Sequence, residues 1–174
     1  MNKHSQLIVE ASIAAGPRKG STAEPELGED VACLAQTRTH MAFCLCDGTS
    51  NEKSFLGLST RRLAQDFAGY YVHAALASPQ GEDPARLATE TLNTKWNNLL
   101  QEKWQQLDER KQQKIRETLP PAPDGGQAIQ LSLVFIAGLF EHTSHTLQLV
   151  GVGDCSGWVF SSDQAPFYVE PLPN

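Results

Sequence analysis

The chain has 174 residues, of which 40% are hydrophobic and 20% charged, and its formal net charge is −6 at pH 7. This length and composition suit one globular domain with a hydrophobic core and exclude wholesale disorder, while an acidic chain without a basic stripe is a poor candidate for nucleic-acid binding. No apolar run is long enough to cross a bilayer, and the apolar stretch at the N-terminus is short and contains Glu10, so neither a membrane partner nor a signal peptide is expected.

The first part of the chain reads as short strands. Residues 6–14 predict a strand, and a loop rich in Gly, Pro and Ser/Thr follows it. The apolar runs 31–35 and 41–46 predict two further strands, which form a hairpin because the polar stretch QTRTH separates them. The pair Asp47-Gly48 then predicts a turn at the end of the second strand.

The middle of the chain changes to helical periodicity. Apolar residues at spacings near three, four and seven predict a helix over 54–76 and a longer helix over 84–119, which a cluster of Pro and Gly ends. Apolar runs at 128–140 and 146–152 predict strands again, and two shorter strands follow them. Strands grouped on both sides of a helical pair predict an α+β layered domain rather than alternating βαβ units.

Acidic residues flank the two strands of the predicted hairpin. Glu29 and Asp30 precede the first strand, and Asp47 follows the second, so Asp30 and Asp47 are expected at the same edge of the sheet. Two carboxylates and the exposed carbonyl of Gly48, without His or Cys, form a hard oxygen site that suits Mg²⁺ or Mn²⁺. The alternative is that both acids are solvated turn residues, since Asp-Gly turns are common.

The four cysteines are Cys33, Cys44, Cys46 and Cys155. They form no C-x-x-C motif, and no His pair completes a zinc pattern with them. Cys44 and Cys46 are two positions apart, so on a strand they share a face. We expect small buried residues with reduced thiols and, from that, a cytoplasmic location.

The order of these motifs resembles the opening of the type 2C metal-dependent serine/threonine protein phosphatases, and is closest to their bacterial branch. The segments that carry the resemblance are LIVEASIAAGPRKG, GED and FCLCDGTSN and, after two helices, LSLVFIAGLF and LVGVGDCSGWVF. In that family an acidic pair starts one strand, an Asp-Gly pair ends the next, and a Gly-Asp-Ser-type turn follows later. Glu29-Asp30, Asp47-Gly48 and Gly153-Asp154-Cys155 stand at the matching places in this chain.

The resemblance implies a β-sandwich of two antiparallel sheets flanked by helices (α/β/β/α) over residues 1–174, with two Mg²⁺ or Mn²⁺ ions at one end. A metal-bridging water would attack the phosphorus of phosphoserine or phosphothreonine in a phosphoprotein substrate or a kinase partner. Asp47 would bridge the metals and the Gly48 carbonyl would bind one of them. Asp30, with Glu29, would hold metal-bound waters, and Asp154 would stabilise its turn.

The sequence also departs from the family pattern. The family's later metal-binding aspartates, in an Asp-Gly and an Asp-Asn block, have no counterpart before Asn174, so we expect a C-terminally incomplete domain. The family's phosphate-binding Arg lies just before the acidic pair. Arg18, the only Arg in that stretch, is the candidate for this role, although it lies far ahead of Asp30; the alternative is a solvated loop charge. Two alternatives to an active phosphatase follow: an inactive phosphatase-like binding or regulatory module, and a truncated fragment of a longer phosphatase.

Overall fold

The computed structural model describes residues 30–48, 54–118, 133–153, 155, 157–159 and 167–169. These residues confirm an α+β fold, in which strands precede and follow three helices along the chain. In chain order the elements are β1 (Val31–Gln36), β2 (His40–Gly48), β3 (Ser54–Phe55), β4 (Leu58–Ser59), α1 (Thr60–Ala77), α2 (Pro84–Gln105), α3 (Glu109–Thr118), β5 (Leu133–Glu141), β6 (Thr146–Val152), β7 (Gly157–Val159) and β8 (Phe167–Val169). Among the helices described, none has both the length and the apolar character that crossing a membrane requires.

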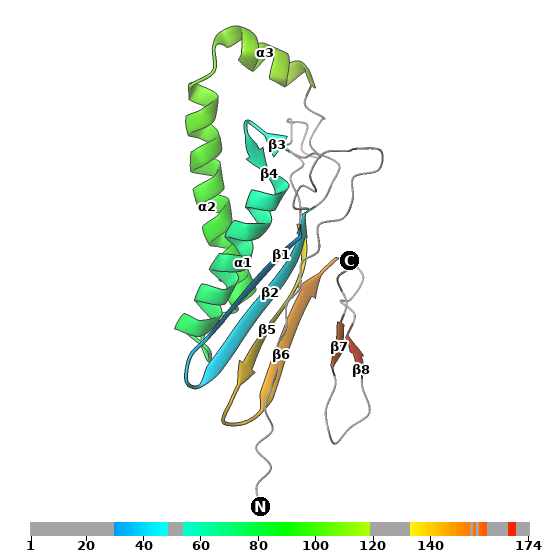
Figure 1. The fold of residues 1–174 in the computed structure, drawn as a ribbon. Coiled ribbons are helices and arrows are strands. Elements are labelled where there is room, and N and C mark those ends of the chain that lie inside the picture. Colours follow the sequence, from blue (N-terminus) through cyan, green and yellow to red (C-terminus); the bar gives the residue numbers. More distant parts are fainter. Residues whose placement is uncertain are drawn as a thin grey trace, which may run out of the picture.

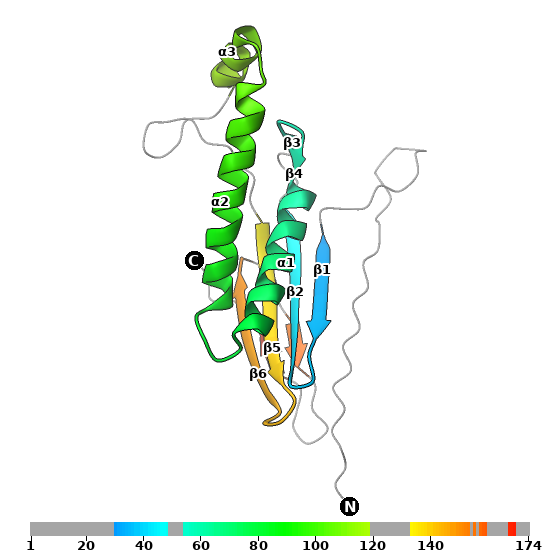
Figure 2. The same ribbon diagram turned by 90° about the vertical axis from the view of Figure 1, so that its left-hand side faces the viewer.

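The main sheet has four antiparallel strands in the order β1-β2-β5-β6. The predicted hairpin is confirmed: β1 pairs with β2, and the amide of Thr37 donates to the carbonyl of His40 at 2.7 Å in the connection. Helix α1 lies across one face of the sheet over β1 and β2, and α2 packs against α1 (Figures 1 and 2). Both long helices therefore cover the same face.

The hydrophobic core lies between this face and the helices. Alternate residues of each strand point toward α1, and the ring of Phe67 on α1 packs against that of Phe135 on β5 with centroids 4.6 Å apart. The buried members of the core are Ala42, Cys44, Cys46, Leu58, Leu63, Ala64, Phe67, Ala68, Tyr71, Val72, Ala75, Ala88, Leu92, Trp96, Phe135, Ala137 and Leu139. Small residues on β2 let α1 approach the sheet closely.

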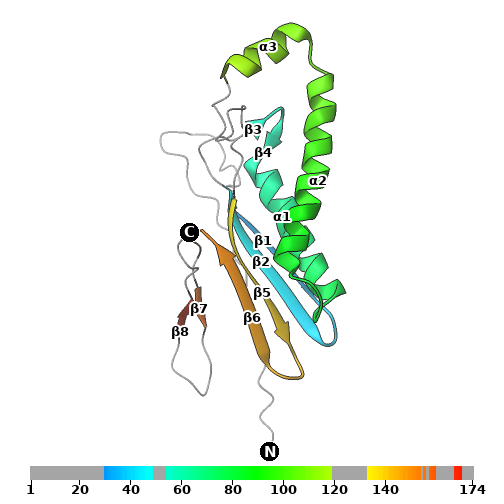
Figure 3. The same cartoon turned by 180° about the vertical axis from the view of Figure 1, so that it is seen from behind.

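The opposite face of the sheet is also apolar. Leu34 and Leu45 project there with 43% and 41% of their surface exposed, whereas Met41 and Ile136 are buried without belonging to the helix-side core. The small hairpin of β7 and β8 lies on this side, away from the helices (Figures 1 and 3). Besides the main sheet, the described residues form just two small two-stranded sheets, β3-β4 and β7-β8.

The first helix begins later than the sequence predicted. Instead of starting at residue 54, α1 begins at Thr60, because residues 54–59 form the β3-β4 hairpin. The turn residues Leu56 and Gly57 have φ values of 49° and 76°, the left-handed conformation that a tight hairpin turn needs. Ser59 then caps α1 and accepts a hydrogen bond from the amide of Arg62 at 3.2 Å.

The sequence predicted one helix over 84–119, and this is wrong because the structure has two helices there, α2 and α3. Residue 119 lies outside the described residues. Helix α2 begins as predicted at Pro84, but it ends at Gln105. Asp108 caps α3 by accepting from the amide of Lys111 at 2.8 Å, and this backbone hydrogen bond lowers the pKa of the Asp108 carboxyl. Arg116 lies over the ring of Trp104, with its guanidinium carbon 5.4 Å from the centroid, and holds α3 back against α2.

Helices α1 and α2 are joined by a polar contact within the core. The Asp66 carboxylate accepts from the indole Nε1 of Trp96 at 3.0 Å and from Nε of Arg62 at 2.9 Å. We expect Asp66→Ala to lower the free energy of unfolding by about 1–3 kcal/mol, because the buried indole N–H loses its acceptor. Urea denaturation measures this, with Asp66→Asn as the control, which keeps an oxygen for Trp96 and is expected to lose less. Equal losses in both variants would show that the charge of Asp66, rather than its bond to Trp96, stabilises the contact.

Candidate active site

The register of the sheet brings Asp30 and Asp47 together. Val31 pairs with Cys46 across β1 and β2, so Asp30 and Asp47, each one residue further, fall opposite each other at the end of the sheet. Directly opposed residues of antiparallel strands have Cα atoms about 4.5–5.5 Å apart. A shared ligand between the two carboxylates is therefore within reach.

Both acidic side chains project away from the helices. Val31 and Cys46 pack in the helix-side core, so their neighbours Asp30 and Asp47 point to the opposite face by strand alternation, and both are exposed. The predicted turn at Asp47-Gly48 is wrong in detail, because β2 continues through both residues and Gly48 pairs with Leu133 of β5. Pairing with β5 extends the strand beyond the point where the apolar run ends.

Arg61 is a basic residue at this edge that the sequence reasoning missed. It lies in the first turn of α1, and its Nη1 donates to the backbone carbonyl of Asp30 at 3.4 Å. Its guanidinium therefore reaches the backbone of the acidic edge from the helix side of the sheet, and its N–H donors match the geometry of a phosphate. The available signal was the Ser59-Thr60 pair, which marks the start of α1 and hence the place of Arg61.

Gly153, which follows β6, lies toward the same end of the sheet. Phe135 pairs with Val152, so Gly153 follows opposite Val134, and Val134 itself pairs with Asp47. Gly153 has a φ of 93°, and a Cβ there would lie 2.2 Å from Cγ1 of Val134. Glycine is therefore required at residue 153, where the chain leaves the sheet two strands away from Asp47.

Two carboxylates, those of Asp30 and Asp47, are the charged oxygen donors described at this edge, and Mg²⁺ is commonly bound by one or two carboxylates together with waters and substrate phosphates. Gly48 is buried and paired with Leu133, so its carbonyl is not exposed as the predicted turn required. Within the described ranges, no group of three or more His, Cys, Asp or Glu side chains is placed to hold a metal ion. Glu29, Arg18 and Asp154 lie outside the described residues.

The three cysteines of the main sheet, Cys33, Cys44 and Cys46, project to its helix side, whereas Asp30 and Asp47 project to the opposite face. No two cysteines form a disulfide, and Cys44 and Cys46 share a face as predicted, with their Sγ atoms 3.5 Å apart. The hydrogen bond with Cys46, together with burial, raises the pKa of Cys44 far above its ordinary value. A thiol held protonated under α1 is a packing residue rather than a nucleophile.

Comparison with known proteins adds no relative to this picture. No family model, curated protein or solved structure matches the chain.

Proposed function

We propose that the chain is a type 2C phosphatase-like domain that hydrolyses phosphoserine and phosphothreonine in proteins at a Mg²⁺ or Mn²⁺ site. The observation that carries the proposal is the opposition of Asp30 and Asp47 at one edge of the sheet, with Arg61 beside them. A divalent cation bound there would lower the pKa of water and offset charge on the phosphoryl oxygens.

Each residue of this edge has a separate task in the proposal. Asp47 binds the cation directly. Asp30, aided by Glu29, accepts hydrogen bonds from water on the cation and so orients it for attack on phosphorus. Arg61 attracts the phosphate, because a guanidinium offers several N–H donors in a geometry that matches phosphate oxygens.

The proposal includes a second sheet that packs on the face opposite the helices. Exposed apolar side chains such as Leu34 and Leu45, beside the buried Met41 and Ile136, are typical of a face that another layer covers. We assign that layer to β7 and β8, together with the strand that the sequence predicts at residues 6–14, which lie outside the described residues. The carboxylates of Asp30 and Asp47 project to this same face, so the cation would lie at the end of the cleft between the two sheets.

An inactive binding module is the second candidate. Its support is that the described part of the chain brings two carboxylates to the edge and not a third. So few charged ligands would hold a cation weakly. Such a module would fold without metal and retain affinity for a phosphorylated partner through Arg61.

The test is hydrolysis of a phosphothreonine peptide by the purified full chain while Mn²⁺ is titrated. We expect saturable, Mn²⁺-dependent release of phosphate, and this activity should elute with the protein on size exclusion. Little phosphate should be released from a phosphotyrosine peptide. No turnover from a chain shown by circular dichroism to be folded would overturn the enzyme and favour the binding module. An insoluble or molten chain would favour a fragment that needs further residues.

Arg61 provides a graded prediction for this assay. We expect Arg61→Ala to lower kcat/KM by about 10-fold, because charge-assisted hydrogen bonds contribute roughly 1.5–3 kcal/mol. Arg61→Lys keeps the charge and is expected to lose less. Arg110→Ala, on the exposed helix α3, is the matched control and should leave kcat/KM unchanged. A full rate in Arg61→Ala would remove this residue from the site.

A further inference from the structure

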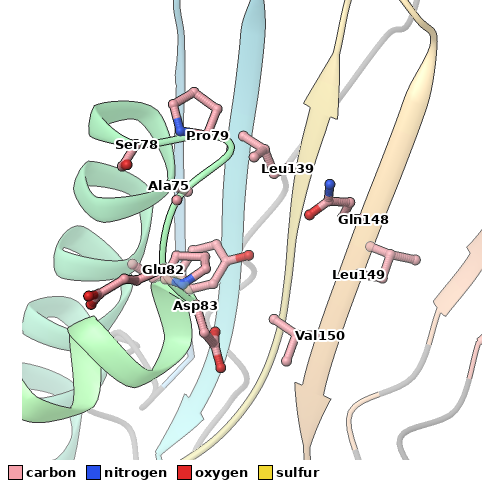
Figure 4. A pocket seen from close by; sticks show the side chains of 12 residues that line it. Ala75, Ser78, Pro79, Glu82, Asp83, Leu139, Gln148, Leu149 and Val150 are labelled. Carbon is pink, nitrogen blue, oxygen red and sulfur yellow. The ribbon is translucent and has the colours of Figure 1, made fainter.

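A cavity of about 250 Å³ lies on the helix-side face of the sheet, apart from the acidic edge. It opens between the α1–α2 connection and strands β5 and β6 (Figure 4). Leu139 lines the cavity and lies on the same strand, β5, as Val134 of the acidic edge. The two residues are roughly 17 Å apart along the strand, at a rise of about 3.4 Å per residue. The cavity is therefore separate from the proposed phosphatase site.

The cavity exists because the helices cover the sheet unevenly. Helix α1 packs on β1 and β2 and contacts β5 less, and no helix packs closely on β6. Residues 78–83 turn back over this gap, and the amide of Gly81 donates to the carbonyl of Ser78 at 3.0 Å within the turn. The connection between two helices thus forms the roof of the cavity, and β5 and β6 form its floor.

A tyrosine lines this cavity. Tyr71 is 2% exposed as a residue, and its hydroxyl has no hydrogen-bond partner among the described residues. Burial, the nearby Cys44 and the carboxylate of Asp83 raise its pKa, so the phenol stays neutral and remains both a donor and an acceptor. The hydroxyl is therefore open to water or to a polar ligand inside the cavity.

The charge around the cavity is negative. Its lining includes two carboxylates, Glu82 and Asp83, and no Lys, Arg or His. Glu82 is paired with Arg86 and turns away from the sheet in Figure 4, whereas Asp83 lies on the sheet side. Asp83 uses Oδ1 to cap α2, accepting from the amide of Ala85 at 2.9 Å, which leaves Oδ2 as a further acceptor.

The floor of the cavity combines an amide with apolar surface. Gln148 stands on β6 facing the α1–α2 connection, between Leu139 on β5 and Val150 (Figure 4). Pro79 and Ala75 line the side toward the helices. A ligand in this cavity meets oxygen acceptors at one end and apolar side chains along its length. The volume is smaller than that of most sites for drug-sized ligands.

We propose that this cavity binds a small aliphatic ammonium ion. The ammonium group pairs with Asp83 and donates to the hydroxyl of Tyr71 and the amide oxygen of Gln148, while the carbon chain lies against Leu139 and Val150. An anion is disfavoured by Asp83, and a neutral ligand makes no use of the charge of that exposed carboxylate. The same chemistry is offered by a free amine or by the side chain of a lysine on another protein.

The test is a titration of the ¹⁵N-labelled full chain with n-butylammonium, followed by NMR. We expect saturable shifts confined to amides of residues 75–85, 139 and 148–150, with a Kd on the order of 1 mM for so small a ligand. 1-Butanol, which has the same carbon chain, should bind at least about tenfold more weakly. Nα-acetyl-lysine methylamide, which mimics a lysine within a protein, distinguishes the two sources of the ammonium group. Affinity equal to that of n-butylammonium supports a lysine of another protein, and binding of n-butylammonium alone supports a free amine.

Two conservative variants test the assignment of the ammonium group. Asp83→Asn keeps the cap of α2, since Asn caps as well as Asp, and should weaken binding at least about tenfold. Tyr71→Phe should weaken it about threefold to tenfold, and Glu102→Gln, an exposed change elsewhere on α2, should leave it unchanged. Wild-type affinity in Asp83→Asn, equal affinity for 1-butanol, or no shift at about 50 mM amine would overturn the proposal.

Discussion

Replacing Asp47 by asparagine is expected to lower Mn²⁺-dependent kcat/KM at least about 100-fold, a loss of about 2.7 kcal/mol in transition-state stabilisation. Asparagine keeps the size of the side chain but removes the negative charge that attracts the cation. Asp47 and Asp30 are the two carboxylates of the described edge, so neutralising one of them removes half of its negative charge. The measurement is phosphate release from a phosphothreonine peptide over a full Mn²⁺ titration.

Two controls separate a metal effect from a folding effect. Asp108→Asn makes the same change at an exposed cap of α3, where asparagine caps equally well, and should keep the full rate. Mn²⁺ should also raise the Tm of the wild type more than that of Asp47→Asn, because a ligand that binds the folded state stabilises it. Full Mn²⁺-dependent activity in Asp47→Asn would show that the metal is bound elsewhere.

Replacing Phe67 by alanine is expected to lower the free energy of unfolding by about 3–5 kcal/mol. Phe67 is 3% exposed, and its ring packs 4.6 Å from that of Phe135. The truncation leaves a cavity between α1 and β5 and removes an aromatic pair, so both the transfer and the packing contributions are lost. Urea denaturation monitored by circular dichroism measures the change, with the slope m checked for constancy.

Leu45→Ala provides the matched comparison on the opposite face of the sheet. Leu45 is 41% exposed, so we expect a loss of no more than about 1 kcal/mol if this face carries no further layer. A loss comparable with that of Phe67→Ala would instead support the second sheet of the proposed sandwich. A loss below about 1.5 kcal/mol for Phe67→Ala itself would contradict the packing of α1 on this sheet.

Local patterns were sufficient for most of the fold. The polar stretch QTRTH between two apolar runs predicted the β1-β2 hairpin, and Thr37 shows why the turn forms there, since its hydroxyl accepts from the amide of His40 at 3.0 Å. Helical spacing located α1 and α2, and Pro84 marked the start of the second helix. These features depend on interactions between residues close together in the chain, which the sequence displays directly.

The errors in the fold arose where spacing and backbone conformation disagree. Leu56 fits the helical period of the residues after it, yet it lies in a hairpin turn with a φ of 49°. Leu107 extends the apolar pattern of α2, yet Asp108 accepts from the amide of Lys111 and starts a new helix. Periodicity reports which side chains lie on one face, and it does not report the dihedral angles or caps that interrupt a helix.

The sequence by itself determined the α+β class, the hairpin and, through its register, the pairing of Asp30 with Asp47. Only the tertiary structure decided that Arg61 contacts the carbonyl of Asp30, and that the α1–α2 connection closes a cavity over Tyr71 and Gln148. The physical reason is the distance along the chain between the residues that interact. Strand pairing across a short turn follows from local order, whereas contacts between a helix and distant strands depend on how α1 and α2 pack on the sheet.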